Sequence, residues 1–101
     1  MPETVVSVDF SNAYSKSERI FSRNIVRVNV GGETTVGQVK ATVLGYLSIP
    51  YLDLYLLRLK DRDLQDEEKV RELGLSERSV LVLACRNFEE LYERMRRDRR
   101  L

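Results

Sequence analysis

The fold is decided by the stretch from Thr34 to Ala84, which contains four short motifs: TTVGQVK at residues 34–40, Ile-Pro at 49–50, LQDEEKV at 64–70 and SVLVLA at 79–84. The first is typical of a helix start and the second of a helix end. The third is an acidic turn, and the fourth is an apolar run of the length of a buried strand. Few folds share the resulting order of helix, strand, acidic turn and strand.

The helix in this stretch is predicted from its cap and from its apolar stripe. Gly31-Gly32 lets the chain turn without a steric penalty, and Thr35 with Gln38 forms a capping box. Pro50 cannot continue the helix and favours extended geometry at Ile49. One helical face is formed by Val36, Val39, Val43, Leu44 and Leu47.

The other apolar segments predict strands. Residues 4–10 alternate with Val6, Val8 and Phe10 on one face, and residues 20–30 resume the pattern with Arg27 facing solvent. Further strands are expected at residues 52–59, from Leu64 and at residues 79–85, with a short helical turn anchored by Val70, Leu73 and Leu75.

Two strands, one helix and returning strands are the elements of a β-grasp fold. From the first Thr to the last Leu, the four motifs fall at the separations found in ubiquitin, with one extra residue between Pro50 and Leu64. Residues 4–85 therefore resemble a ubiquitin-like domain. The resemblance implies an α+β fold in which a mixed four- or five-stranded sheet packs on one helix, with residues 1–86 as the domain.

Residues 87–101 are predicted to form a separate amphipathic basic helix. Asn87 is a good N-cap, Glu89 and Glu90 lie in the first turn, and arginines follow at residues 96–100, in agreement with the helix dipole. An apolar stripe is formed by Phe88, Leu91, Tyr92 and Met95. This helix either folds back over the sheet near Val82, or docks on a partner, or continues as a coiled coil.

The composition gives no sign of catalysis. The 101 residues contain no histidine and one cysteine, Cys85, so the commonest general base and metal ligand are missing and no internal disulfide can form. The acidic run at residues 61–68 lacks the spacing of a calcium loop, and Gly31-Gly32 lacks the lysine of a phosphate loop. We expect a non-enzymatic cytoplasmic or nuclear protein with no cofactor, metal, small-molecule substrate or membrane segment.

The resemblance to ubiquitin also implies where partners bind. The positions that match the receptor-binding patch of ubiquitin are Val82, Ala84 and Arg58, and Arg58 replaces an apolar residue at the centre. Ordinary ubiquitin receptors should therefore bind poorly, and a partly acidic partner fits better. No glycine follows Gly74, so a conjugated modifier, which needs a Gly-Gly tail, is not expected.

Short motifs resemble particular ubiquitin-like proteins. Thr35-Val36-x-x-Val39-Lys40 with Leu47-x-Ile49-Pro50 resembles tubulin-folding cofactor E, and residues 17–23 resemble cofactor B. The turn at residues 60–66 and Phe88-Glu89-x-Leu91 are similar to elongin B, a ubiquitin-ligase adaptor. These resemblances imply an adaptor or chaperone-cofactor role, with a tubulin-pathway or ubiquitin-pathway protein as the partner.

The expected function is thus non-catalytic protein binding. The predicted contact residues are Arg58, Val82, Ala84, Phe88, Leu91, Tyr92, Met95 and Arg27. Two alternatives stay open. A β-grasp domain that binds a small GTPase would use its second strand, with Arg23 and Arg27 facing acidic residues of the GTPase. A nucleic-acid-associated protein would use the Arg-rich tail on phosphates.

Overall fold

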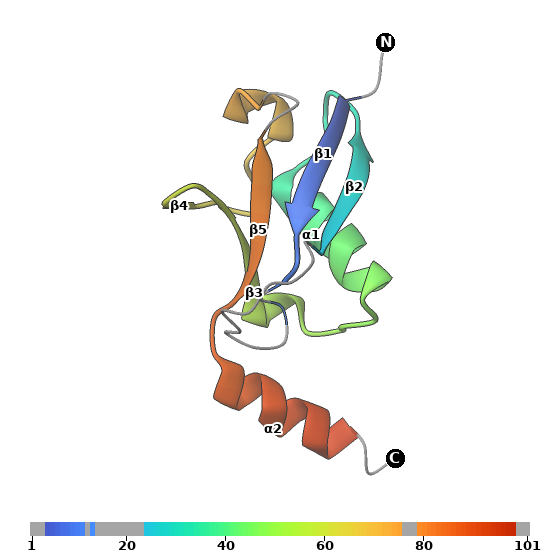
Figure 1. Cartoon of the computed structure of the whole chain (residues 1–101), viewed down its shortest axis with the longest axis vertical. Coiled ribbons are helices and arrows are strands. Elements are labelled where there is room, and N and C mark those ends of the chain that lie inside the picture. Colours follow the sequence, from blue (N-terminus) through green and yellow to red (C-terminus); the bar gives the residue numbers. More distant parts are fainter. Residues whose placement is uncertain (1–3, 12, 14–23, 76–78, 99–101) are drawn as a thin grey trace.

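The computed structural model describes residues 4–11, 13, 24–75 and 79–98 (Figure 1). Its strands are β1 (Thr4–Asp9), β2 (Ile25–Val30), β3 (Tyr55–Leu59), β4 (Arg62–Asp63) and β5 (Val80–Cys85). Its helices are α1 (Val36–Tyr46), α2 (Phe88–Asp98) and the short 3-10 helices η1 (Leu52–Leu54) and η2 (Val70–Leu73). Within the described residues, no helix is long and apolar enough to cross a membrane.

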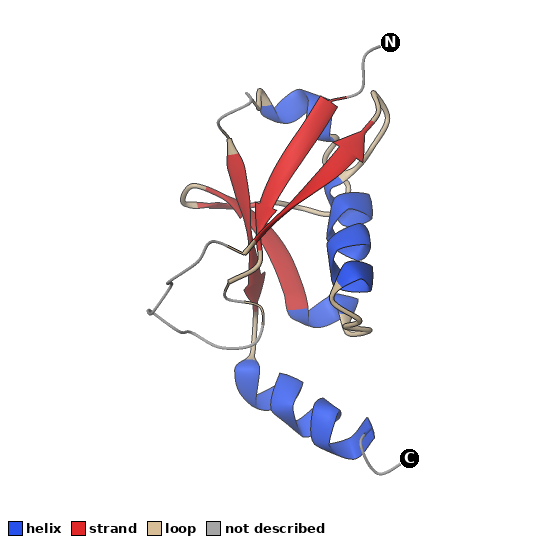
Figure 2. Ribbon diagram, turned by 45° about the vertical axis from the view of Figure 1, so that its right-hand side comes forward, coloured by secondary structure: helices blue, strands red, loops and turns tan. Residues whose placement is uncertain are grey.

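The five strands form one mixed sheet in the order β2-β1-β5-β3-β4. The pairings of β1 with β2 and of β3 with both β4 and β5 are antiparallel, whereas β1 and β5 run parallel. Helix α1 lies against one face of the sheet, while α2 lies beyond one end of it (Figure 2). This is the α+β β-grasp arrangement that the motif order predicted.

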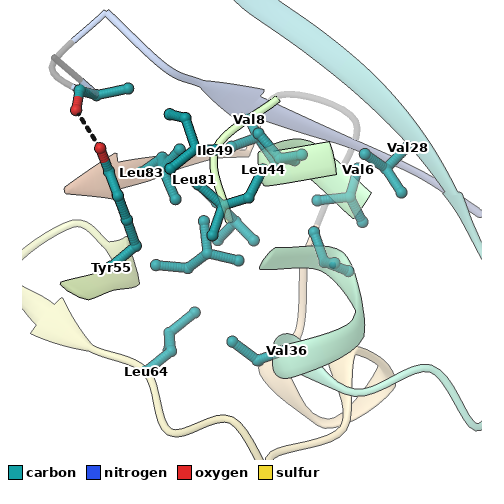
Figure 3. Packing of buried hydrophobic residues seen from close by; sticks show 14 of the residues in the cluster. Val6, Val8, Val28, Val36, Leu44, Ile49, Tyr55, Leu64, Leu81 and Leu83 are labelled. Atoms are coloured by element: carbon teal, nitrogen blue, oxygen red, sulfur yellow. Dashed lines mark hydrogen bonds between the residues drawn. The ribbon is translucent and has the colours of Figure 1, made fainter. Parts of the chain in front are cut away.

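The core lies between α1 and the sheet (Figure 3). Val8, Val43, Leu44, Leu57, Leu81 and Leu83 are completely shielded from solvent. Tyr55 is also fully buried, and its hydroxyl donates a hydrogen bond of 2.6 Å to the carbonyl of Ala13. A neutral hydroxyl can be buried here because its hydrogen bond is satisfied.

The start of α1 confirms the predicted capping box, because the side chains of Thr35 and Gln38 each accept a bond from the other's backbone N–H. The end of α1 also agrees with the prediction, since the helix stops at Tyr46 with Leu47 as its C-cap, before Pro50, but the motif that ends it was not predicted. Ser48 is left-handed (φ 60°), and the N–H groups of Ser48 and Ile49 return to the carbonyls of Gly45 and Leu44. This is a Schellman motif, which terminates the helix by backbone hydrogen bonding.

Two strand boundaries were predicted wrongly. Residues 52–54 form η1 instead of the start of the third strand, and the short β4 comes before Leu64 instead of beginning there. The apolar character of Leu64 suggested a strand. In the structure Leu64 is indeed buried, but it lies just after β4. The short helical turn at Val70 is confirmed, and residues 20–23 of the expected second strand lie outside the described residues.

Among the described residues, one charged side chain lies in the interior. Lys40 is only 4% exposed, and its ammonium group donates to the carbonyl of Tyr55 (3.2 Å) and to the carboxylate of Asp66 (3.0 Å). The three groups come from α1, β3 and the loop after β4. Lys40 therefore ties the helix to the sheet and to that loop.

Candidate protein-interaction surfaces

The first candidate surface is the side of β3 and β5 opposite α1. Leu57 and Leu83 are paired across the two strands and point into the core. Because successive side chains of a strand alternate, their neighbours point the other way. We call these neighbours the outer patch: Leu56, Arg58, Val82 and Ala84. In the strand register, Arg58 lies opposite Val82 and Leu56 opposite Ala84.

The outer patch combines one cation with apolar neighbours. The Nε of Arg58 lies 2.8 Å from a carboxylate oxygen of Asp63 on β4, and both side chains are largely accessible. Such an exposed pair contributes little stability and can be exchanged for another carboxylate. Val82 and Ala84 are half-buried and Leu56 is buried. The predicted residues Arg58, Val82 and Ala84 are thus brought together, in a geometry suited to binding a side chain that is partly acidic and partly apolar.

Arg27 lies apart from the outer patch. It is exposed on β2, at the edge of the sheet, and β1 separates it from β5. Its cross-strand partner is Ser7, which in turn neighbours Val80 of β5. Arg27 forms no ion pair with any other described residue. It would meet a partner only at the β2 edge or across a wide contact on the sheet.

The predicted stripe of α2 is divided between the core and the solvent. Asn87 caps the helix as expected, since its side-chain oxygen accepts the N–H of Glu90 at 3.1 Å. Leu91 is completely buried in the main hydrophobic core, and Phe88 and Met95 pack against the same core while partly exposed. Tyr92 is 44% exposed and its ring lies 6.0 Å from that of Phe88. Leu91 can therefore reach a partner only if α2 leaves the domain.

The docking site of α2 corrects the expectation that this helix covers the sheet near Val82. Its contacts lie on the segment before β3, at the end of the sheet (Figures 1 and 2). Both terminal nitrogens of Arg94 donate to the carboxylate of Asp53 at 2.9 Å, and the guanidinium lies 5.7 Å from the ring centre of Tyr51. The hydroxyl of Tyr51 donates to Asp98. A bidentate pair of this kind fixes the position of the helix.

Titration of these groups is coupled to the docking of α2. The hydrogen bonds from Arg94 hold the pKa of Asp53 below its ordinary value, and the same contact raises the pKa of Arg94. The hydrogen bond to Asp98 raises the pKa of Tyr51 because it favours the protonated phenol. All three shifts favour the usual ionisation state at neutral pH, which is the state in which these contacts hold α2 in place.

Two grooves border α2. One, of about 360 Å³, is formed by Ile49, Pro50 and Tyr51 on one side and Leu91, Met95 and Asp98 on the other, with Ser48 at its edge. The second, of about 550 Å³, runs along Cys85, Arg86 and the first turn of α2 as far as Tyr92. Both are open to solvent and lined by side chains that suit packing against a protein.

The described residues include no group of three or more His, Cys, Asp or Glu side chains placed to hold a metal ion. The sequence also contains no histidine. The candidate surfaces described above consist mainly of apolar side chains and ion pairs.

Sequence reasoning missed two parts of these surfaces. Leu56 belongs to the outer patch, and the alternation with Arg58 along the strand was a signal that could have found it. The pair of Asp53 with Arg94 had no such signal, because 41 residues separate the two.

Comparisons with known proteins agree with this architecture. No family profile and no curated protein sequence matches the chain. Among solved structures, the chain is similar to ubiquitin from Caldiarchaeum subterraneum, with a TM-score of 0.66, 22% identity and coverage of 85% of this chain and 96% of that one. It is also similar to the ubiquitin-like domain of an Arabidopsis thaliana protein, with a TM-score of 0.63, 19% identity and coverage of 86% and 81%. The chain has the ubiquitin-like β-grasp fold.

Proposed function

We propose that this chain is a non-catalytic protein-interaction module that acts as an adaptor or chaperone cofactor through the outer patch. The observation that carries the proposal is the register of β3 and β5, which places Arg58 beside Val82 and Leu56 beside Ala84 on the side opposite α1. Arg58, Val82 and Ala84, which come from two strands, are the accessible side chains of this surface.

The charge of Arg58 defines the partner's chemistry. Burying this guanidinium against an apolar receptor surface would leave a charge without a partner, which costs several kcal/mol. A partner carboxylate could instead take the place of Asp63, which is itself 61% exposed. The favoured partner therefore presents an acidic residue beside an aliphatic or aromatic one.

A modifier role is less well supported, although one similar structure is an archaeal ubiquitin. Conjugation requires a flexible tail that ends in Gly-Gly. Here β5 is followed within three residues by α2, and Leu91 fixes that helix in the core. Residues 75–101 contain no glycine.

The test compares two charge reversals of the same kind. Arg58→Glu changes the outer patch, whereas Arg71→Glu reverses an ion-paired arginine of η2 that is also exposed, at 54% against 44% for Arg58. Tagged full-length chains carrying each change are cross-linked in cells, and the proteins recovered are quantified by mass spectrometry. Partners that bind the outer patch should be lost with Arg58→Glu and kept with Arg71→Glu. Equal recovery with both variants would refute the proposal.

The identity of the recovered protein decides between the two roles. Tubulin or a tubulin-pathway chaperone indicates a cofactor role, as the motifs shared with tubulin-folding cofactors suggest. A cullin-type ligase scaffold indicates an adaptor role, as the similarity to elongin B suggests. Binding is then repeated with the purified partner and the same two variants.

A second candidate is the binding of a small GTPase along β2. The favouring observation is that β2 is an edge strand and carries the exposed Arg27. An edge strand can pair with a strand of another protein, and a cation beside it can contact acidic residues. This function predicts binding that depends on GTP loading and is lost with Arg27→Glu but kept with Arg58→Glu.

A further inference from the structure

The side of α2 turned away from the domain carries a separate pattern of charge. Leu91 faces the core, whereas Glu89, Tyr92 and Arg96 are all exposed. Their spacing of three and four residues places them on one face of the helix, one above the other. In Figure 1 this helix lies at the far end of the molecule, beyond the sheet, so a second molecule can approach its outer side.

The charges on this outer side are divided along the helix. The first half carries Glu89 and Glu93, and the second half carries Arg96 and Arg97. None of these four forms an ion pair with another described residue, whereas Arg94 and Glu90 are paired with each other. The helix therefore presents an acidic half and a basic half whose charges are not matched within the domain.

We propose that two copies of this chain associate through α2, with the helices antiparallel and Tyr92 near the two-fold axis. A helix rises about 1.5 Å per residue, so Glu89 lies roughly 4.5 Å before Tyr92 and Arg96 roughly 6 Å after it. In an antiparallel pair, Glu89 of one copy then lies nearly level with Arg96 of the other. Because of the two-fold axis, this ion pair occurs twice in the dimer, as expected for a surface that is complementary to itself.

The size of the surface sets the strength of the association. Eleven helical residues extend about 16 Å, and one exposed aromatic ring per copy forms the centre. A contact of this size falls well below the area of a standard stable interface, which is about 800 Å² per partner. The dimer is therefore weak, with dissociation in the range of roughly 10 μM to 1 mM, and it weakens as salt screens the ion pairs.

The acidic half of the helix also argues against a nucleic acid as the occupant. A polyanion that contacted Arg96 and Arg97 would meet Glu89 and Glu93 on the same side of the helix and would be repelled there. A second copy instead brings Arg96 level with Glu89, so the acidic and basic ends of the two helices face each other. Charge complementarity thus favours self-association.

The test uses sedimentation velocity of the purified full chain from about 10 μM to 1 mM at low salt, because this spans the expected dissociation range. The wild type should change from monomer to dimer. Glu89→Arg and Arg96→Glu should each weaken self-association by on the order of tenfold, because two attractive pairs become repulsive. An equimolar mixture of the two variants should form a heterodimer about as strongly as the wild type.

Controls separate the interface from effects on folding or net charge. Arg27→Glu makes the same charge change as Arg96→Glu on β2 and should leave the dimer intact. Tyr92→Arg should weaken the dimer because it places two cations at the axis. Far-UV circular dichroism checks the helix content of each variant. A wild type that stays monomeric at 1 mM, a mixture that fails to associate, or equal weakening by Arg27→Glu would overturn the proposal. Arg58→Glu should not affect the dimer, so the outer patch and this interface are tested independently.

Discussion

Removal of Asp66 is predicted to destabilise the domain more than removal of Lys40, although both changes break the same ion pair. Asp66 has a side chain that is 52% exposed, whereas Lys40 is only 4% exposed. A carboxylate that loses its partner here is still solvated by water. An ammonium group that loses its partner stays in the interior with the Tyr55 carbonyl as its remaining described acceptor.

The structure gives the size of this difference. Lys40→Met keeps an apolar stem of similar shape and loses mainly the bond to the carbonyl, so we expect a loss of about 1 kcal/mol in the free energy of unfolding. Asp66→Ala leaves a buried charge without its counter-ion, for which about 3 kcal/mol is expected. Once Lys40 is absent, Asp66 has little left to stabilise. The double variant should resemble Lys40→Met alone, with a coupling of about 2–3 kcal/mol.

The assay is urea unfolding of the two single variants and the double variant, followed by circular dichroism. Glu33→Ala provides the control, because it removes a carboxylate that is 74% exposed and paired with Lys69. This control should leave the midpoint nearly unchanged. If Lys40→Met costs as much as Asp66→Ala, or if the two effects simply add, the reasoning from burial is wrong.

Three further predictions follow from the backbone and the docking contacts. Gly37→Ala should lower stability by about 1 kcal/mol in thermal unfolding, because the new Cβ would lie 3.1 Å from Cβ of Asp66. Gly45→Ala has open space around it and should raise stability by up to about 1 kcal/mol, because alanine favours the helix more than glycine does. Equal effects would contradict this. Ser48→Gly should raise stability by about 0.5–1 kcal/mol, because the left-handed φ of 60° favours glycine. A loss of stability in this variant would show that the backbone of Ser48 is not strained. The lowered pKa of Asp53 means that its stabilisation of α2 is complete above the ordinary value of 3.8 and is lost as pH falls through the lowered pKa. An NMR titration should place the Asp53 carboxyl below 3.8, and replacement of its arginine partner by glutamine should return it to that value.

Local patterns predicted the parts of the fold that depend on neighbouring residues. The capping box of Thr35 and the apolar stripe of α1 follow from spacing along the chain, and both are present. The end of α1 before Pro50 was predicted, but its Schellman motif was not, because Ser48 carries no marker for a left-handed conformation, which is usually assigned to glycine. Residues 52–54 are apolar enough for a strand, but tertiary packing holds them in a 3-10 helix.

The surfaces were harder to predict than the fold. Val82 and Ala84 were chosen because they match receptor-binding positions of ubiquitin, and both are half-buried on β5, between the buried Leu81 and Leu83. The position of α2 depends on contacts between Arg94 and the segment before β3, which sequence spacing cannot reveal. The burial of Lys40 was also missed, although the sequence carried a signal for it. Lys40 lies four residues after Val36 and four before Leu44, on the buried stripe of α1.

The parallel pairing of β1 with β5 has a consequence for the synthesis of the protein. Ser7 of β1 pairs with Val80 of β5, so the centre of the sheet cannot form until β5 has left the ribosome. Contacts between such distant residues slow folding because a long loop must close first. The outer patch also requires β5, as Arg58 meets Val82 only in the completed sheet. A nascent chain that has not yet released β5 therefore lacks the outer patch, and a partner that bound this patch would bind only molecules whose sheet is complete.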